Sequence, residues 1–520
     1  MVHLLKRTMF GSAKADIDYF KSKTMAEAVD ELLNPAAPLP APPVKEYDPT
    51  GAATPDTNIA PGTTWVNDPS TDSTIHSRRN ASFKKWWTGV MLSQDRSIME
   101  KMTLFWSNHF STLVRMISNS QYVYKHHDLL RTYSLGNFKT LIKAVTIDPG
   151  MLVSLNGKDN SVSGPNENYA RELQELFTLG KENIPGYTEN DVKAAAKVLT
   201  GWQVNANTVS STFTVSRHDK TNKQFSSFYN NTVITGRSSA TAGDQEIDDL
   251  LNMIFNKKAE VSNFIVKKLY RWFCYYTITD EVQANVINPL ADIFQQSNWE
   301  IRPVLAALFK SEHFYDAAVR GCMIKSPVDF VTGLFREFNV GFPDPVNAYA
   351  DAYIMWEYMR STYVSPMNQN IGDPLDVSGW PAYYQIPQYY ELWINSSTLP
   401  LRNKFAESFL GSGYTRNGFT VKIDPVAFAR ALPNPDNPNL LIMDSLEILY
   451  AVPLSATAQQ TIKQQILLTG QANDQYWKDA WDAYKNTNYN NNSTQYKTVQ
   501  TRLVNLYKYL LLNLAEYQLH

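Results

Sequence analysis

Apolar residues recur along most of this chain at the spacing of amphipathic helices. Residues 4–34 and 78–131 show this pattern first. A further helix near 138–148 should stop before Pro149, because a proline disfavours helical geometry in the residue before it. The pattern returns after residue 244 and closes the chain in a stripe of Leu503, Leu506, Tyr507, Leu510, Leu511 and Leu514. We therefore expect a mainly α fold with a large multi-helix core.

A long stretch without helical spacing follows the first helices. Residues 35–77 are rich in Pro, Ala, Thr and Asp. A proline inside a helix removes a hydrogen bond, and closely spaced prolines favour extended backbone. We expect a strap that packs along the surface and is anchored by Trp65.

Residues 210–237 show the alternation that is typical of strands. Strand-like runs lie near 212–215 and 232–235, and the tripeptide Arg-His-Asp at 217–219 lies between them. This pattern predicts one small β-hairpin with the tripeptide at its turn.

These segments divide the chain into four parts. Residues 1–34 form N-terminal helices, and residues 35–77 form the Pro-rich strap. Residues 78–320 form a helical core that contains the hairpin near 210–237. Residues 321–520 form a C-terminal helical part with aromatic loops, and we expect it to pack on the core.

Charge and composition exclude several classes of protein. The 520 residues carry a formal net charge of −2 and no dense block of Lys or Arg, so nucleic acid is not expected as a partner. No apolar run approaches about 18 residues, the lower end for a membrane span. Cys274 and Cys322 lack metal-ligand spacing and are expected to be buried thiols. No signal peptide is visible, which predicts a cytoplasmic protein as written, or an exported one if the sequence is already processed.

The densest charge cluster lies in PNENYARELQELFTLG, residues 165–180, which we expect to be a helix ended by Gly180 in left-handed geometry. Glu172 and Glu175 are three residues apart, so both carboxylates can face one point, as in helical di-metal sites. The alternative is structural. Glu167–Arg171 and Arg171–Glu175 are each four apart, which is the spacing of an ion-pair network along a helix.

Two histidines are candidates for the same chemistry. His109, in the sequence WSNHF, could be a general base or a metal ligand, because imidazole titrates near neutral pH. The alternative is a buried histidine that bonds a backbone carbonyl or Glu175. His218 and Asp219 could complete a metal or acid/base centre, although adjacent residues on an extended chain usually point apart.

Further residues have a structural interpretation, and some of them also have a functional one. Asp191 is expected to cap a helix start with Thr188. Trp202 is either core or a ligand platform. The Tyr- and Trp-rich residues 380–393 either stack on sugar rings or pack over helices. The candidate catalytic or metal-binding residues are His109, Glu172, Glu175 and His218, and the candidate ligand-binding residues are Asn108, Glu167, Asn168, Arg171, Trp202 and Asp219.

Several motifs in order resemble the bacterial domain of unknown function 1800 family. They are LLKRTMFG at 4–11, EKMTLFWSNHF at 100–110, LGNFKTLIKAVTIDPGML at 135–152, residues 165–180, YTENDVKAAAKVLTGW at 187–202, RHD at 217–219, IKSPVDFV at 324–331, residues 374–402 and the closing YLLLNLAEYQLH. The resemblance implies no assigned activity. It does imply a partner, because members are commonly encoded beside sulfatase-like or phosphatase-like proteins of an uncharacterised family numbered 1501.

Two functions remain open. The first is a non-catalytic binding or assembly protein that acts with such a partner. The second is a hydrolase that uses the carboxylate and histidine residues, with a divalent metal ion or a carboxyl of raised pKa to activate water. Whether the protein is an enzyme is left undecided, since no nucleotide-binding, zinc-protease or serine-hydrolase motif is present.

Overall fold

Helices form nearly all of the regular structure in the computed structural model, which describes residues 1–48, 51–181 and 186–520. This confirms the mainly α fold. The N-terminal helices are α1 (Val2–Thr8), α2 (Lys14–Lys21) and α3 (Met25–Leu33). The C-terminal helices are α17 (Pro327–Glu337), α18 (Tyr349–Met359), α19 (Thr398–Leu410), α20 (Pro425–Arg430), α21 (Pro438–Leu449), α22 (Ala456–Thr461), α23 (Gln475–Asn486) and α24 (Thr494–Leu512).

The middle of the chain holds the longest series of helices. They are α4 (Ser73–Leu92), α5 (Met99–His109), α6 (Val114–Ile117), α7 (Ser120–Thr132), α8 (Phe138–Thr146), α9 (Pro149–Ser154), α10 (Asn168–Glu172), α11 (Glu189–Val198), α12 (Ala242–Phe255), α13 (Lys258–Phe273), α14 (Asp280–Val282), α15 (Asn288–Gln296) and α16 (Ile301–Lys310). Helix α8 stops before Pro149 as expected, and this proline opens α9.

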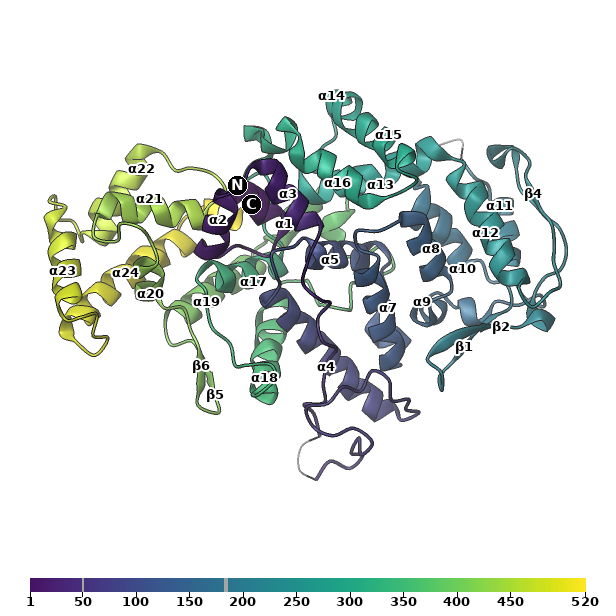
Figure 1. Cartoon of the computed structure of the whole chain (residues 1–520), viewed down its shortest axis with the longest axis horizontal. Helices are drawn as coiled ribbons and strands as arrows, with labels where there is room; N and C mark the ends of the chain where they lie inside the picture. Colours follow the sequence, from purple (N-terminus) through teal and green to yellow (C-terminus); the bar gives the residue numbers. More distant parts are fainter. Residues whose placement is uncertain (49–50, 182–185) are drawn as a thin grey trace.

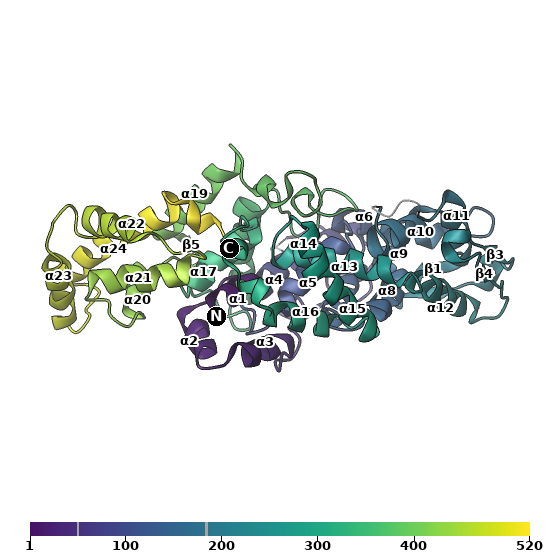
Figure 2. The same ribbon diagram turned by 90° about the horizontal axis from the view of Figure 1, so that it is seen from above.

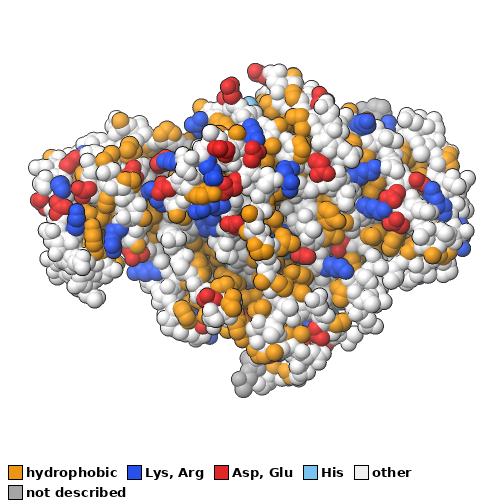
Figure 3. Space-filling model, in the orientation of Figure 1, with side chains coloured by type: hydrophobic (Ala, Val, Ile, Leu, Met, Phe, Trp, Pro, Cys, Tyr) orange, Lys and Arg blue, Asp and Glu red, His pale blue; other side chains and the backbone are white. Residues whose placement is uncertain are grey.

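The molecule is elongated. Helices α21 to α24 lie at one end, and α11, α12 and the strands β1 to β4 lie at the other (Figures 1 and 2). The N-terminal helices pack across the middle, where the two chain termini lie close together. On the face shown in Figure 3, cationic and anionic side chains are intermixed over the surface and are not gathered by sign.

Two expected helix boundaries follow from local chemistry. The Thr188 hydroxyl accepts from the Asp191 amide, and the Asp191 carboxylate accepts from the Thr188 amide, which confirms the capping role of Asp191. Gly180 has φ +79°, which confirms the left-handed end of the Glu-rich segment.

The Glu-rich segment is not one regular α-helix. Helix α10 ends at Glu172 and continues as a π-helical turn over Leu173–Thr178. A π turn takes more residues than an α turn, so side chains beyond Glu172 no longer follow the three- and four-residue spacing of an α-helix. Glu172 and Glu175 therefore do not have the relative placement that the three-residue spacing of a regular α-helix predicts.

The expected single hairpin is wrong in its pairing. Strand β1 (Trp202–Asn205) pairs with β2 (Ser210–Phe213), and β3 (Lys223–Gln224) pairs with β4 (Val233–Ile234), so there are two hairpins. The tripeptide 217–219 joins them and is not a hairpin turn. Strand β2 pairs with β1, its near neighbour in the sequence, and not with β4. The Asn205 side chain favours this pairing because it accepts from two backbone amides and closes a short turn between β1 and β2.

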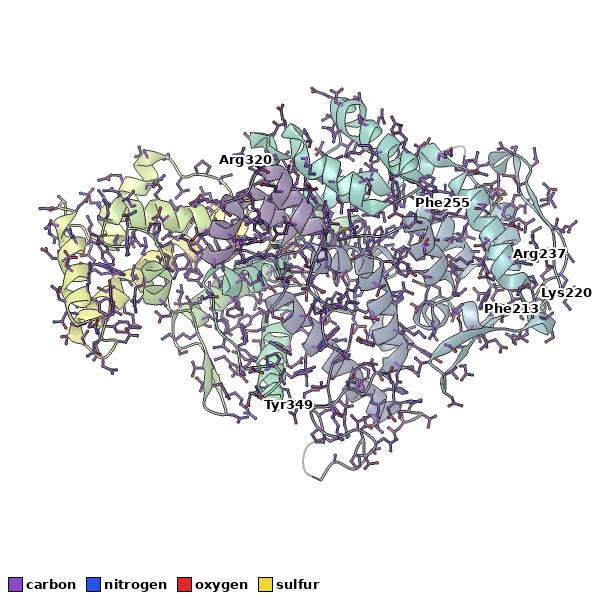
Figure 4. The ribbon with its side chains drawn as sticks, viewed as in Figure 1. Phe213, Lys220, Arg237, Phe255, Arg320 and Tyr349 are labelled. Carbon is purple, nitrogen blue, oxygen red and sulfur yellow. The ribbon has the colours of Figure 1, made fainter. Side chains whose placement is uncertain are left out.

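A third hairpin, absent from the expectation, pairs β5 (Tyr414–Arg416) with β6 (Phe419–Val421). Its turn residues Asn417 and Gly418 both have positive φ. Asn-Gly is the strongest short-range hairpin signal, so the sequence did contain the information. In the β1–β2 hairpin, Phe213 of β2 packs against Gly243 at the start of α12 (Figure 4).

The Pro-rich strap is extended and packed, apart from residues 49–50, which lie outside the described residues. Trp65 is fully buried, as expected of an anchor, and Gly62 packs against the ring of Tyr349 at the start of α18 (Figure 4). The strap ends earlier than residue 77. Asp72 caps α4 by accepting from the amides of residues 74 and 75, so residues 73–77 are helical.

One hydrophobic core runs through the described residues. The closing stripe is buried along α24, except for Leu514, which lies beyond the helix and is partly exposed. Cys274 is buried, whereas Cys322 is only partly so, and both are free thiols. Within the described residues, no helix combines the length and the apolar character that crossing a membrane requires.

A buried ion pair fastens the strap to α4. Arg79 is fully buried and donates to both carboxylate oxygens of Asp56, at 2.8 and 2.9 Å. It also donates to the side chain of Asp68 at 2.7 Å. Both aspartates belong to the strap, so this one guanidinium holds the strap at two positions. Arg78 and Lys85 of the same helix add pairs with Asp48 and Glu46.

We expect Arg79→Met to lower the free energy of unfolding by about 3–5 kcal/mol, because Asp56 would stay buried without a counter-charge. Chemical denaturation measures the change, and limited proteolysis should cut within the strap first. The control is Lys158→Met, which breaks the exposed Lys158–Asp159 pair and should cost less than about 1 kcal/mol. An equal loss of unfolding free energy in the two variants would contradict the role of Arg79 in fastening the strap.

Candidate functional site

His109 is the last residue of α5 and is 3% exposed, among aromatic rings. Its Nε2 lies 3.1 Å from the carbonyl oxygen of Phe177, and its Nδ1 lies 3.2 Å from Nζ of Lys268. A carbonyl can only accept, so Nε2 carries the proton and Nδ1 accepts from the ammonium group. The expected bond to a backbone carbonyl is present, and the second partner is a lysine.

Burial lowers the pKa of His109 well below its usual value, and the charge of Lys268 lowers it further. The ring therefore stays neutral near physiological pH. A neutral ring keeps its acceptor nitrogen, so the contact with Lys268 persists.

His109 lines a pocket of about 250 Å³ between α5, α13 and the loop around residues 378–390. Of the sequence-predicted residues, the pocket brings together Asn108, His109 and Glu175. Its remaining described lining residues are Phe105, Leu176, Lys181, Phe264, Lys267, Lys268, Arg271, Trp272, Tyr276, Met323, Ser378, Ala382, Tyr383, Tyr384, Ile386, Tyr389 and Tyr390.

One face of α13 forms the cationic wall of the pocket. Phe264, Lys267, Lys268 and Arg271 recur at i, i+3, i+4 and i+7, which places them along one side of the helix. The opposite side is apolar and buried. The helical spacing after residue 244 covers this helix, but its cations were not among the candidate residues, although a basic stripe with an aromatic residue at helical spacing was the available signal.

The aromatic wall comes from a distant segment. The rings of Trp272 and Tyr383 lie 4.4 Å apart, centroid to centroid, and the Arg271 guanidinium lies 5.5 Å from the ring centroid of Tyr389. These contacts join the two walls. The aromatic segment therefore does pack over helices, and part of it also lines a pocket.

Asn108 positions this aromatic segment. Its Oδ1 accepts from the Trp380 amide at 2.9 Å. The neighbouring Gly379 has φ +90°, and a Cβ there would clash with Asn108. Only glycine allows the loop to approach α5 so closely.

The two glutamates differ in their surroundings. Glu175 lines the pocket and pairs with Lys181. Glu172 is not among the described lining residues, and its Oε2 is buried without a hydrogen-bond partner in the described part of the chain. Burial raises the pKa of Glu172, although Lys181 and Arg171 act in the opposite direction.

The expected ion-pair network is only half correct. Arg171 pairs with Glu167 at 3.3 Å, as predicted, but its main partner is Glu189 at 2.7 Å. The predicted Arg171–Glu175 pair does not form, because the π turn rotates Glu175 toward Lys181 and the pocket. Asn168 is exposed at the start of α10.

His218 belongs to a different cluster. Its Nε2 lies 3.1 Å from Glu246, whose other oxygen accepts from Lys223 at 2.6 Å, and all three side chains are fully buried. Asp219 turns away to accept from the amide and hydroxyl of Thr221. This cluster braces the hairpins against α12 and does not reach the pocket.

Trp202 is 8% exposed, and its ring packs on Phe213, which fits the core interpretation. Within residues 1–48, 51–181 and 186–520, no three His, Cys, Asp or Glu side chains are grouped as a metal ion would need.

The family model described as "Protein of unknown function (DUF1800)" matches residues 3–519. No curated protein and no solved structure matches the chain.

The neutral state of His109 predicts a dependence of stability on pH. An unfolded histidine binds a proton below about pH 6.5, whereas the folded ring does not. The free energy of unfolding should therefore fall as the pH falls below 6.5, by about 1.4 kcal/mol per pH unit for each such histidine. Burial lowers the pKa in the same direction at His3, His76, His127 and His520.

We expect His109→Gln to flatten this slope by about one proton between pH 6 and pH 5, because glutamine does not titrate. Urea unfolding at each pH gives the slope. NMR of the ring nitrogens in the unchanged protein should show the Nε2–H form over the same range. If the free energy of unfolding depended on pH with the same slope in both proteins, this would contradict a neutral His109.

Proposed function

This chain belongs to the DUF1800 family of proteins of unknown function, and we propose that it is a non-catalytic binding protein whose pocket holds an anionic ligand. One observation carries the proposal. The described lining of the pocket includes four cationic side chains and one carboxylate, that of Glu175. Cationic side chains that line a concave site attract ligands of negative charge.

The arrangement of Lys268 supports the same function. Its ammonium group donates to Nδ1 of His109 and lies 3.4 Å from the carbonyl oxygen of Leu176. A lysine side chain is otherwise flexible, and fixing it in advance reduces the entropy lost when an anion binds. His109 thus acts as a positioning residue for Lys268.

The other candidate residues are buried or already bonded within the protein, which also favours binding over catalysis. His218 and Glu246 are fully buried within their own ion-pair cluster. Both nitrogens of His109 are engaged, which leaves the ring no acceptor for a substrate proton.

The proposal includes a partner protein, for which the family resemblance suggests a sulfatase-like or phosphatase-like chain. Supporting it are apolar side chains on the loop that borders the pocket. Leu375 is 66% exposed and Ile386 is 70% exposed. Both residues belong to the segment 374–402, and exposed apolar patches are typical of contact surfaces.

A hydrolase is the second candidate, and Glu172 is the observation that favours it. A carboxyl with a raised pKa and an unpartnered oxygen can serve as a general acid. Glu172 shares Lys181 with the pocket residue Glu175, since this lysine acts on the pKa of one and pairs with the other. A divalent metal would belong to this second candidate only.

We expect Lys268→Met to remove most of the stabilisation that inorganic phosphate gives to the unchanged protein. Bound anion raises the melting temperature by mass action, so the phosphate-induced rise at constant ionic strength reports binding. Lys258→Met is the matched control, since Lys258 starts the same helix, is exposed and does not line the pocket. The same rise in all three proteins would contradict the proposed function.

Glu172→Gln separates the two candidates. For a binding protein, the variant and the unchanged protein should hydrolyse nitrophenyl phosphate and nitrophenyl sulfate at the same background rate. A rate in the unchanged protein that the variant lowers by about 100-fold or more would establish the hydrolase, because general acid catalysis contributes that much. Metal analysis of both samples then shows whether an ion takes part.

A further inference from the structure

We infer that a second pocket of this protein binds a small organic ammonium ion, which is an apolar body that carries a protonated amine. This pocket, which we call the strap pocket, has a volume of about 410 Å³ and lies between residues 35–44 of the strap, α4 and α18. It shares no described lining residue with the pocket at His109. The inference therefore concerns a separate site and goes beyond the proposed function.

The walls of the strap pocket are mostly apolar. Four prolines of the strap line it, together with the rings of Trp86 of α4 and of Tyr353 and Trp356 of α18. These two helices lie side by side (Figure 1). Small-molecule sites are typically cavities of about 300–1,000 Å³ with apolar and aromatic walls, so the strap pocket matches them in both size and character.

The aromatic rings of the strap pocket are held in place by the surrounding backbone. The Tyr353 hydroxyl accepts from the Val44 amide at 3.0 Å, and Nε1 of Trp86 donates to a strap carbonyl oxygen at 2.8 Å. Gly89 of α4 lies so close to Trp356 that a Cβ there would be 2.5 Å from its ring. Walls that are already formed reduce the entropy that a ligand loses on binding.

The charges in the strap pocket are all of one sign. Its described lining contains two carboxylates, those of Asp95 and Glu100, and no Lys, Arg or His. Glu100 is bonded through both oxygens to Arg131, at 2.6 and 3.0 Å, so its charge is balanced. The carboxylate that remains for a ligand is therefore that of Asp95.

Asp95 is exposed in the loop between α4 and α5, and its carboxylate makes no hydrogen bond and no ion pair within the described residues. One buried cation lies within reach of its charge. Burial lowers the pKa of Arg336, and the charges of Asp16 and Asp95 act in the opposite direction. The Arg336 guanidinium, however, donates to the carbonyl oxygens of Leu92 and Gln94 at 3.1 and 3.0 Å. The carboxylate oxygens of Asp95 thus remain open to a donor from a ligand.

A protonated amine on an apolar body uses both features of the strap pocket. Its N–H groups donate to the Asp95 carboxylate, and such charge-assisted hydrogen bonds are among the strong ones. Its positive charge is also attracted by the faces of tryptophan and tyrosine rings. An acid would be repelled, because like charges placed together are costly. A neutral apolar molecule would fill the walls without a partner for Asp95, so it should bind more weakly.

Calorimetric titration of the full chain tests this inference with three probes that share one indole ring. Tryptamine carries a protonated amine, indole-3-ethanol a neutral hydroxyl and indole-3-acetate a carboxylate. Tryptamine should bind about tenfold or more tightly than either of the others, because it alone can pair with Asp95. Equal or tighter binding of the alcohol or the acid would overturn the inference, as would the absence of tryptamine binding at about 1 mM.

Variants assign the contact to Asp95. Asp95→Asn keeps the size of the side chain and removes its charge, so it should weaken tryptamine about tenfold and leave indole-3-ethanol unchanged. Asp292→Asn is the matched control, since Asp292 is exposed on α15 and does not line the strap pocket. It should change the affinity of neither probe.

The outcomes with these variants also separate the two pockets. Lys268→Met, which tests the pocket at His109, should leave the affinity for tryptamine unchanged. Weaker tryptamine binding in Lys268→Met would place the amine in the other pocket and overturn the inference. An equal effect of Asp95→Asn on tryptamine and indole-3-ethanol, or no effect relative to Asp292→Asn, would overturn it as well.

Discussion

Helix α5 carries polar side chains into the middle of the protein, and each must find a partner there, because an unpaired buried charge is strongly destabilising. The partners come from four different segments, so this one helix fixes their positions around itself. Its contacts are Glu100 with Arg131 of α7 at 2.6 Å, Lys101 with Asp329 of α17, Asn108 with the Trp380 amide, and His109 with the Phe177 carbonyl oxygen. The N-terminal end of α5 holds the core together, and its C-terminal end shapes the pocket.

The same constraint explains why a neutral histidine lies beside a lysine. His109 is buried too deeply to be charged, so it offers Nδ1 as an acceptor. Lys268 supplies the donor from α13, and this contact sets the distance between α5 and the cationic wall. A second cation at position 109 would repel Lys268, which makes the neutrality of the ring a condition for the geometry of the site.

Much of the fold could be predicted from the sequence, because helices and their ends depend on local spacing. The capping box at Thr188 and the left-handed Gly180 are contacts between near neighbours. The pairing of strands depends on residues that lie farther apart in the sequence. An alternating pattern identifies a strand but not its partner, and so β2 and β4 were joined in the expectation although each has another neighbour. The π turn after Glu172 left no periodic signal and changed where Glu175 points.

The candidate site was only partly predictable for a related reason. Asn108, His109 and Glu175 were identified because each lies in a conspicuous local motif, whereas Lys268 lies in an ordinary amphipathic helix. What makes that lysine part of a site is the approach of a loop more than 100 residues later in the chain, through the contact between Asn108 and Trp380. One wall comes from α13 and the other from the loop around residues 378–390. A ligand that touches both would stabilise this arrangement, by an amount that grows with the ratio of its concentration to its dissociation constant.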